Sequence, residues 1–349
     1  MASSATDLTG EAARPRPKRA PSAHCPTASP DRLNPDRRIC HRVEGSSSAH
    51  YLYMKKILII LGQTATGKSS IAVRLAKKYR GEIISADSRQ VYKDLNIATG
   101  KVTKKEMQGV PHHMLSIISP KKIFSVAEWQ KQTKKIITQI HNRDRLPIIC
   151  GGTGFYIKSI VENVVLPDVP PNIKLRKKLD GKTAEELSRI LKRLDPKILS
   201  KIDRQNPVRL VRAIEIASSL GHIPEIRTEK PQYDILQIGL KLPKKMLDDK
   251  IKERVKTRIR AGMFSEGSRL YNGGLSFKRM RILGLEYRLL ADFLEKKISR
   301  DDFIKQLEVA DTQYARRQWQ WFKKDKKIKW FSPNNIRKIE KVVDDFLDK

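Results

Sequence analysis

The feature that most constrains the fold is an apolar run that turns through a glycine-containing loop into an amphipathic stretch. Residues 57–61 read Ile-Leu-Ile-Ile-Leu, and the loop that follows reads Gly62-Gln63-Thr64-Ala65-Thr66-Gly67-Lys68-Ser69. Apolar residues then recur at helical spacing, at Ile71, Ala72, Leu75 and Ala76. A strand, a G-x-x-x-x-G-K-[ST] loop and a helix in this order predict a phosphate-binding loop in an α/β protein.

The chemistry of such a loop is specific. Backbone N–H groups of the loop and of the helix N-terminus surround a phosphate chain. Lys68 adds a positive charge, and the Ser69 hydroxyl can bind Mg²⁺. We therefore expect residues 62–69 to bind a polyphosphate, with Mg²⁺ as cofactor and Ser69 as its ligand. The loop alone does not identify the polyphosphate, nor whether a phosphate is transferred.

The charge of the chain points to a polyanionic partner. Its 349 residues include 72 Lys and Arg against 38 Asp and Glu, a formal net charge of +34. Nucleic acid is the leading candidate, although charge alone does not separate RNA from DNA or an acidic membrane. No apolar run reaches the ~18 residues that span a bilayer, so we expect no membrane partner. The three cysteines lack metal-ligand spacing, which suits a cytoplasmic protein, and Cys150 is expected to be a small buried hydrophobe.

The first 53 residues differ from the rest. They are rich in Ala, Ser, Pro and Arg and have no amphipathic period, so we expect a disordered extension. One interpretation is an organelle transit peptide, which its acidic residues weaken. The other is a start codon assigned too early, with the true start at Met54, where the composition changes.

Two further strands end in polar residues. An apolar run at 82–86 ends in Asp87, and another at 146–150 ends in Gly151-Gly152-Thr153. Ligands of open α/β sheets bind at the carboxyl ends of strands, so Asp87 should face the same cleft as the phosphate loop. Asp87 suits a general base or an outer-sphere Mg²⁺ ligand, with a helix N-cap as the structural alternative. Thr153 can contact a phosphate or a base, or belong to a plain tight turn.

The pair His112 and His113 enters a third predicted strand. Adjacent strand residues point to opposite faces and rarely bind one ion, so we expect packing or backbone hydrogen bonds rather than a metal site.

We expect a P-loop NTPase-like parallel sheet flanked by helices, in three parts after residue 53. Residues 54–165 form the first part of the core, 166–205 a basic helical insertion, and 206–349 the completion of the core with a strand at 235–240 and basic helices. Arg209 lies near the start of a helix, where a cation opposes the helix dipole unless an anion binds, although a solvated basic face is the alternative. Residues 314–324 interleave aromatics with cations, which suits RNA, with Trp319 and Phe322 facing inward.

Two chemistries fit these residues. One is a small-molecule kinase whose loop binds ATP while Asp87 activates a hydroxyl. The other is a transferase whose loop holds a leaving diphosphate while Asp87 activates a nucleophile on nucleic acid. The basic surface from residue 166 onward favours the second.

From about Met54 to Pro333 the chain resembles the tRNA dimethylallyltransferases, also called tRNA isopentenyltransferases or the IPP transferase family. The resemblance rests on the order and spacing of six segments, at 62–69, 87–92, 110–113, 151–156, 205–209 and 316–319. No Cys or His follows His222, so the zinc finger of eukaryotic relatives is not expected and the resemblance is to the bacterial type.

The resemblance implies transfer of a dimethylallyl group from dimethylallyl diphosphate to N6 of the adenosine 3′ of the anticodon, with release of diphosphate. It implies that the loop binds this diphosphate with Mg²⁺, and that Asp87, Lys68 and Thr64 are catalytic, with Asp87 as the general base. Gln63 and Thr66 stand where Pro and Ser are commoner, and activity should survive because both act through their backbone.

The resemblance also implies a set of tRNA contacts. These are Asp87, Ser88, Arg89, Gln90, Thr153, Arg176, Gln205, Asn206, Pro207, Val208, Arg209, Arg281 and Arg317. The expected partners are a tRNA anticodon stem-loop and dimethylallyl diphosphate, and the expected state is a monomer.

Overall fold

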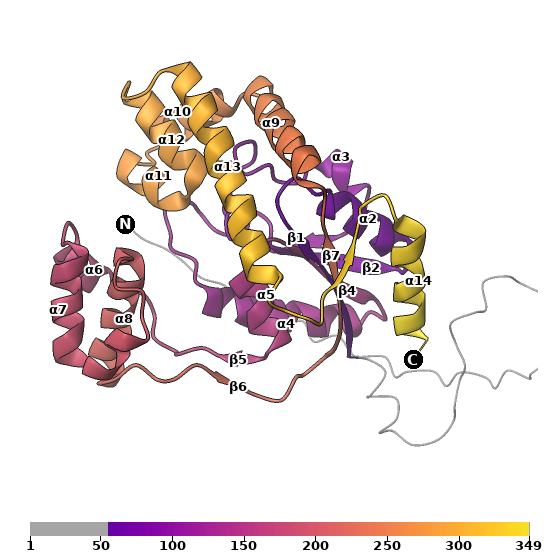
Figure 1. The fold of residues 1–349 in the computed structure, drawn as a ribbon, viewed down its shortest axis with the longest axis horizontal. Coiled ribbons are helices and arrows are strands. Elements are labelled where there is room, and N and C mark those ends of the chain that lie inside the picture. Colours follow the sequence, from indigo (N-terminus) through magenta and orange to yellow (C-terminus); the bar gives the residue numbers. More distant parts are fainter. Residues whose placement is uncertain (1–54, 349) are drawn as a thin grey trace, which may run out of the picture. The chain divides into compact units, whose positions relative to one another are not determined.

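A six-stranded sheet in the order β3-β2-β4-β1-β7-β8 lies at the centre of residues 55–348, the part of the chain that this computed structural model describes (Figure 1). Its strands are β1 (Lys56–Gly62), β2 (Gly81–Ala86), β3 (His112–His113), β4 (Leu146–Gly151), β7 (Asp234–Leu240) and β8 (Lys329–Phe331). Every pairing in this sheet is parallel. The predicted parallel sheet is confirmed, whereas the expectations for residues 1–53 lie outside the described residues.

The central strand β1 is apolar along its length because both of its faces are covered. Ile57, Ile59 and Leu61 belong to one apolar cluster, and Leu58 and Ile60 belong to another. Since successive side chains point to opposite faces, the two clusters are the two layers between the sheet and its helices.

Different helices cover the two faces. Helices α2 (Lys68–Lys78) and α14 (Ile336–Leu347) share the apolar cluster of Leu58 and Ile60. Helices α4 (Val126–His141) and α5 (Gly154–Val161) share the cluster on the other face. The phosphate loop therefore begins at the end of a strand that is held rigidly on both sides.

The third strand is shorter than the sequence suggests. Only His112 and His113 pair with β2, because Met114 and Ser116 have φ of 62° and 52°, which ends the extended conformation. His112 Nδ1 lies 2.8 Å from the Val110 carbonyl oxygen, and His113 Nε2 lies 2.7 Å from a Glu82 carboxylate oxygen. His112 thus bonds to the backbone and His113 to a carboxylate, and both histidines make hydrogen bonds within the fold.

The insertion forms a helical unit with an apolar cluster of its own. It contains α6 (Ile173–Leu179), α7 (Ala184–Leu194), a short 3-10 helix (Pro196–Ser200) and α8 (Pro207–Leu220). The antiparallel pair β5 (Val164–Val165) and β6 (Arg227–Thr228) leads the chain in and out (Figure 1). Because Leu210, Ala213 and Ile214 of α8 share a cluster with Leu187 and Leu191 of α7, the boundary expected at residue 205 falls inside this unit.

The remaining helices form the basic C-terminal part. They are α9 (Lys244–Arg260), α10 (Met263–Asn272), α11 (Phe277–Leu283), α12 (Leu285–Leu294) and α13 (Arg300–Phe322), while the short α3 (Lys104–Met107) lies earlier in the chain. On α13, Phe322 is buried, Trp319 is half-buried against Trp330 with ring centroids 5.0 Å apart, and Arg317 is exposed. Trp319 and Phe322 therefore face inward and Arg317 outward, as expected, whereas Trp321 is exposed.

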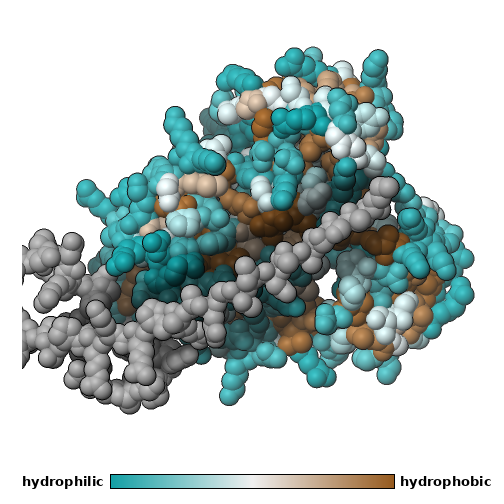
Figure 2. All heavy atoms as spheres, turned by 180° about the vertical axis from the view of Figure 1, so that it is seen from behind, coloured by the Kyte–Doolittle hydropathy of each residue, from teal (hydrophilic) through white to brown (hydrophobic). Residues whose placement is uncertain are grey.

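Hydrophilic side chains cover most of the face seen in Figure 2, with smaller apolar patches between them. No helix among residues 55–348 combines the length and apolar character that a membrane-spanning segment needs.

Replacing Trp129 tests the packing beneath the β2 strand end. Trp129 is fully buried, stacks on Tyr156 at 4.5 Å, and donates from Nε1 to the Ser85 carbonyl oxygen at 3.0 Å. Trp129→Phe keeps an aromatic ring but removes this donor, and should lower the free energy of unfolding by about 1–3 kcal/mol in urea titrations. The exposed Trp321→Phe should change it little, and equal unfolding midpoints for wild type and Trp129→Phe would contradict the assignment.

Candidate active site

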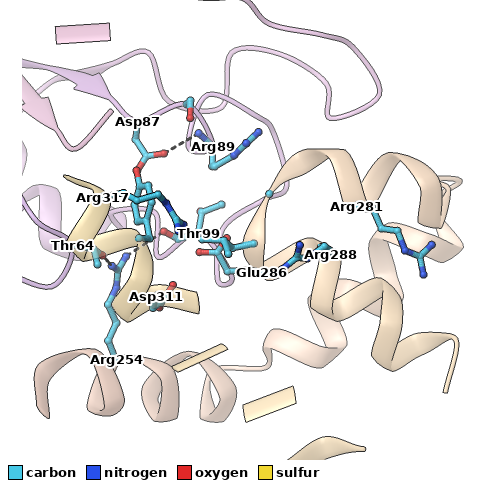
Figure 3. A pocket seen from close by; sticks show the side chains of 14 residues that line it. Thr64, Asp87, Arg89, Thr99, Arg254, Arg281, Glu286, Arg288, Asp311 and Arg317 are labelled. Atoms are coloured by element: carbon cyan, nitrogen blue, oxygen red, sulfur yellow. Dashed lines mark hydrogen bonds between the residues drawn. The ribbon is translucent and has the colours of Figure 1, made fainter. Parts of the chain in front are cut away.

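A cavity of about 420 Å³ lies at the carboxyl ends of β1 and β2, the edge of the sheet where the sequence predicts the site (Figure 3). Its walls come from the phosphate loop, the segment after β2, and helices α9, α11, α12 and α13. It is lined by Thr64, Asp87, Ser88, Arg89, Thr99, Arg254, Arg281, Gly284, Leu285, Glu286, Arg288, Asp311, Tyr314 and Arg317.

The phosphate loop has the backbone conformation that its glycines permit. Gly62 has φ of 139°, and a Cβ there would lie 2.5 Å from the Leu240 carbonyl oxygen, so only glycine fits this turn. Gly67 precedes α2 with φ of 84° and provides no side-chain cap. The first N–H groups of α2 therefore have no capping side chain and are available to an anion.

Lys68 lies within the curve of this loop. Its Nζ donates to the Gln63 carbonyl oxygen at 2.5 Å, and the Thr66 hydroxyl donates to the same oxygen at 2.8 Å. Burial of the ammonium group lowers the pKa of Lys68 from 10.5 to about 8. Burial likewise raises the pKa of the neighbouring Cys150 thiol to about 11, so this cysteine is a neutral, buried side chain as predicted.

Asp87 begins the segment after β2. Its Oδ1 accepts hydrogen bonds from the backbone N–H groups of Arg89 at 2.8 Å and Gln90 at 3.3 Å (Figure 3). Among residues 55–348 no group donates to its Oδ2. The helix N-cap alternative is wrong, because a turn and not a helix follows Asp87. One oxygen accepts from this turn while the other can accept a proton, so this geometry is compatible with a general base.

Thr153 connects the end of β4 to the Asp87 turn. Its N–H donates to the Ala86 carbonyl oxygen at 3.1 Å, and its hydroxyl accepts from the Ser88 N–H at 3.1 Å. The structure therefore brings two of the sequence-predicted elements, the Gly-Gly-Thr turn and the Asp87 segment, into direct contact.

Arg254 of α9 is a site residue that the sequence reasoning missed. Its guanidinium donates to the Thr64 hydroxyl, and from Nη2 to the Thr99 carbonyl oxygen at 3.2 Å. Figure 3 shows the side chain extending from α9 to the phosphate loop. Arg254 and Arg258 are one helical turn apart, and this i, i+4 spacing is the signal that could have marked them as a pair on one face.

Arg258 neutralises two acidic groups behind Arg254. It makes an ion pair with Asp311 and a second, at 3.4 Å, with Glu286, and it donates to the Ala98 carbonyl oxygen at 2.7 Å. Burial, followed by the charge of Asp311, raises the pKa of Glu286. Glu286 and Asp311 were also missed, because their placement depends on helices that no local motif predicts.

Gln318 of α13 joins two loops of the site. Its Oε1 accepts from the Thr64 N–H at 2.7 Å, and its Nε2 donates to the Gly152 carbonyl oxygen at 3.0 Å. A further hydrogen bond is donated by the phosphate loop to the helix, from Gln63 Nε2 to the Ala315 carbonyl oxygen at 3.1 Å. Helix α13 is thus attached to the phosphate loop at two places.

The predicted tRNA contacts fall into two groups. Asp87, Ser88, Arg89, Arg281 and Arg317 line the cavity, with Thr153 next to Ser88. Arg281 makes ion pairs with Asp292 and Glu295, and in Figure 3 it lies apart from the Asp87 side of the site.

The second group lies in the helical unit. Arg176 forms two hydrogen bonds, of 2.6 and 2.8 Å, to the buried carboxylate of Glu215, which gives it a structural role there. Asn206 caps α8 and Arg209 pairs with Asp203 at 3.4 Å, while the Val208 side chain is 79% exposed. Gln205 and Pro207 belong to the same turn, and the contacts of this group with tRNA stay a prediction.

Comparisons with known proteins agree on one family. A family model described as IPP transferase matches residues 90–325. The tRNA dimethylallyltransferase of Caldanaerobacter subterraneus is 37% identical over 305 residues, covering 84% of this chain and 96% of the relative. The tRNA dimethylallyltransferase 2 of Treponema denticola is 41% identical over 275 residues, covering 77% and 92%.

A solved structure has the same fold. The full-length tRNA isopentenylpyrophosphate transferase of Bacillus halodurans superposes with a TM-score of 0.64 at 32% identity, covering 84% of this chain and 97% of that one. The similarity therefore extends over both the sheet and the helical parts that line the cavity.

The lowered pKa of Lys68 predicts a pH dependence of anion binding. Only the ammonium form attracts a phosphate, so the ratio of wild-type to Lys68→Met affinity for inorganic diphosphate should be constant below about pH 7 and fall by up to about tenfold per pH unit above pH 8. The ionisation of diphosphate itself cancels in this ratio. Calorimetric titrations from pH 6 to 9.5 measure this. The exposed Lys77→Met should keep the wild-type profile, whereas identical pH profiles for wild type and Lys68→Met would show that Lys68 does not bind the anion.

Proposed function

The chain belongs to the IPP transferase family, and we infer that it is a tRNA-modifying enzyme that transfers a dimethylallyl group from dimethylallyl diphosphate to N6 of the adenosine 3′ of the anticodon. The observation that carries this function is one cavity that borders both the phosphate loop and the Asp87 carboxylate. A donor diphosphate and an acceptor amine can meet there. The relatives support prenyl transfer and give no support to the kinase alternative.

The phosphate loop would hold the diphosphate of the donor as a leaving group. The loop N–H groups, the α2 N-terminus and Lys68 belong to one short segment, and Arg254 reaches this segment through Thr64. The bond between C1 of the dimethylallyl group and the diphosphate oxygen breaks more easily when fixed positive charges stabilise the charge on that oxygen.

Mg²⁺ fits this donor set. Ser69 is exposed at the start of α2, and its hydroxyl makes no hydrogen bond to any other described residue. Hydroxyl and carboxylate oxygens are ligands that Mg²⁺ prefers, and Ser69 would hold the ion with the donor diphosphate. When bound, Mg²⁺ would neutralise part of the diphosphate charge.

Asp87 would accept the proton of the acceptor. The N6 amine of adenine is a weak nucleophile because its lone pair is delocalised into the ring. As N6 forms a bond to C1, the C1–O bond breaks, its electron pair leaves on the diphosphate, and an N6 proton passes to Asp87 Oδ2. The N–H groups of Arg89 and Gln90 hold Oδ1 and so orient the carboxylate toward the cavity.

The basic side chains around the cavity would bind the RNA. Arg89, Arg288 and Arg317 line it, and guanidinium groups contact phosphates or stack on unpaired bases. The adenine must leave its stack to reach Asp87, at a cost of about a few kcal/mol. An anticodon stem-loop provides an unpaired adenosine that can do so. Monomeric state and cytoplasmic location stay predictions.

A product assay tests this function. The protein is incubated with unmodified anticodon stem-loop RNA, Mg²⁺ and dimethylallyl diphosphate. The RNA is then digested to nucleosides, whose masses are measured by mass spectrometry. Dimethylallyladenosine and one diphosphate per transfer are expected. Phosphorylated product from ATP, with no change in adenosine mass from dimethylallyl diphosphate, would reject the assignment.

Replacing Asp87 separates its two roles. Asp87→Asn keeps an oxygen that can accept from the turn N–H groups but removes the base, so kcat should fall about 10²–10⁴-fold while the Kd for the stem-loop RNA stays within about twofold. The exposed Asp94→Asn, in the same segment, should leave both unchanged. A parallel loss of RNA binding and rate would instead assign Asp87 a binding role.

A further inference from the structure

We propose that Gln318 of α13 is a positioning residue that sets the spacing between the donor and acceptor halves of the active site. This inference rests on the proposed function, because it assigns the phosphate loop to the leaving diphosphate and Asp87 to the acceptor amine. It concerns a side chain that touches neither substrate and acts through the two loops that it joins.

The two loops leave neighbouring strands at the same level. Strands β1 and β4 pair in parallel with Leu61 beside Gly151, so the phosphate loop and the Gly-Gly-Thr turn begin side by side. Sheet hydrogen bonds end there and cannot fix the distance between the loops. Gln318 bridges them with one amide, accepting from Thr64 N–H at 2.7 Å and donating to the Gly152 carbonyl oxygen at 3.0 Å.

The lack of a side chain at Gly152 leaves room for this amide. A Cβ at Gly152 would overlap Gln318 Nε2, so glycine is required for the side chain to reach its acceptor. Gln318 is only 6% exposed, and burying an amide costs free energy unless it is hydrogen-bonded. The other buried positions of α13 are apolar except for Asp311, which lines the cavity. An apolar residue at 318 would fill the space but could not join the loops.

The contacts continue from this bridge to both reacting groups. On the donor side, Thr64 carries the hydroxyl that accepts from Arg254. On the acceptor side, Gly152 precedes Thr153, whose hydroxyl accepts from Ser88 N–H beside Asp87. Gln318 therefore connects the loop that would hold the diphosphate to the segment that carries the general base Asp87.

The chemistry makes this spacing important. N6 and C1 must approach to about 3–3.5 Å in line with the breaking bond, and a misplacement of about 1 Å can reduce a rate by about 10²-fold. A change in the distance between the loops leaves each binding surface intact while moving the reactants apart. The signature of a positioning role is thus a loss in the rate of transfer without an equal loss in affinity.

Two variants perturb the bridge from opposite sides. Gln318→Leu removes the amide, and Gly152→Ala leaves Gln318 in the chain but displaces it with a methyl group. Gln320→Leu is the matched control, because Gln320 is exposed and lies about 200° around the same helix from Gln318. The measurements are the single-turnover rate with saturating dimethylallyl diphosphate and stem-loop RNA, and the Kd values for inorganic diphosphate and for the RNA.

We expect both bridge variants to lower the single-turnover rate by about 10²-fold, with each Kd within about threefold of wild type. Gln320→Leu should match wild type in all three measurements. If Gln318→Leu does not fold, Gly152→Ala decides the question. A wild-type single-turnover rate in Gly152→Ala, or a loss that appears entirely in the Kd for diphosphate, would overturn the inference.

The outcome can be separated from a failure of the proposed function. If the wild-type protein forms no dimethylallyladenosine, the proposed function fails. If the wild-type protein forms it and the bridge variants form it equally fast, only the role of Gln318 fails.

Discussion

The parallel pairing of β4 with both β1 and β2 is the constraint on which the site depends. It places Leu61, Gly151 and Ala86 at one level of the sheet, so the phosphate loop, the Gly-Gly-Thr turn and Asp87 all begin at one edge. The anion-binding loop follows β1, the connecting turn follows β4, and the carboxylate of Asp87 follows β2. The apolar layers on both faces of the sheet hold these strand ends in place, so a reaction between a donor and an acceptor needs only short loops to bring its groups together.

Electrostatics then explain what the cavity accepts. Lys68 is buried enough to lower its pKa to about 8, and Arg254 lies beside it with its guanidinium on Thr64. Behind them, Arg258 is balanced by Asp311 and Glu286, so the inner charges are paired. Among residues 55–348, Lys68 and Arg254 form no ion pair, and a diphosphate would supply an anionic partner for them. Fixed positive charges stabilise the negative charge that develops on a leaving diphosphate as the C–O bond breaks. A prenyl transferase needs this stabilisation, whereas a protein that only binds a phosphate does not.

The sequence predicts what local spacing specifies. The loop at 62–69, the strand before Asp87 and the turn at Thr153 are each contained in one short segment, and the sheet brings them together as expected. Arg254 and Gln318 were missed because they reach the loop from helices far along the chain, and Asp311 was missed because its partner Arg258 lies on another helix. The i, i+4 spacing of Arg254 and Arg258 marks a shared face of α9 but does not show that this face meets the loop. The insertion boundary was misplaced for a similar reason, because the apolar spacing of α8 is the same whichever core it packs against. The ion pair of Arg176 with Glu215 on another helix was not predictable from local spacing either, and the contact of Arg176 with RNA stays a prediction.

The central claim is that one cavity holds the diphosphate in the phosphate loop while the acceptor adenine approaches Asp87. A crystal structure of the protein with Mg²⁺, a non-reactive thio analogue of dimethylallyl diphosphate and an anticodon stem-loop RNA tests it most directly. We expect the diphosphate within residues 62–69, and the N6 atom of one unstacked adenine at hydrogen-bonding distance, about 3 Å, from Asp87. A diphosphate bound outside the loop, or an adenine whose N6 faces away from Asp87, would contradict it.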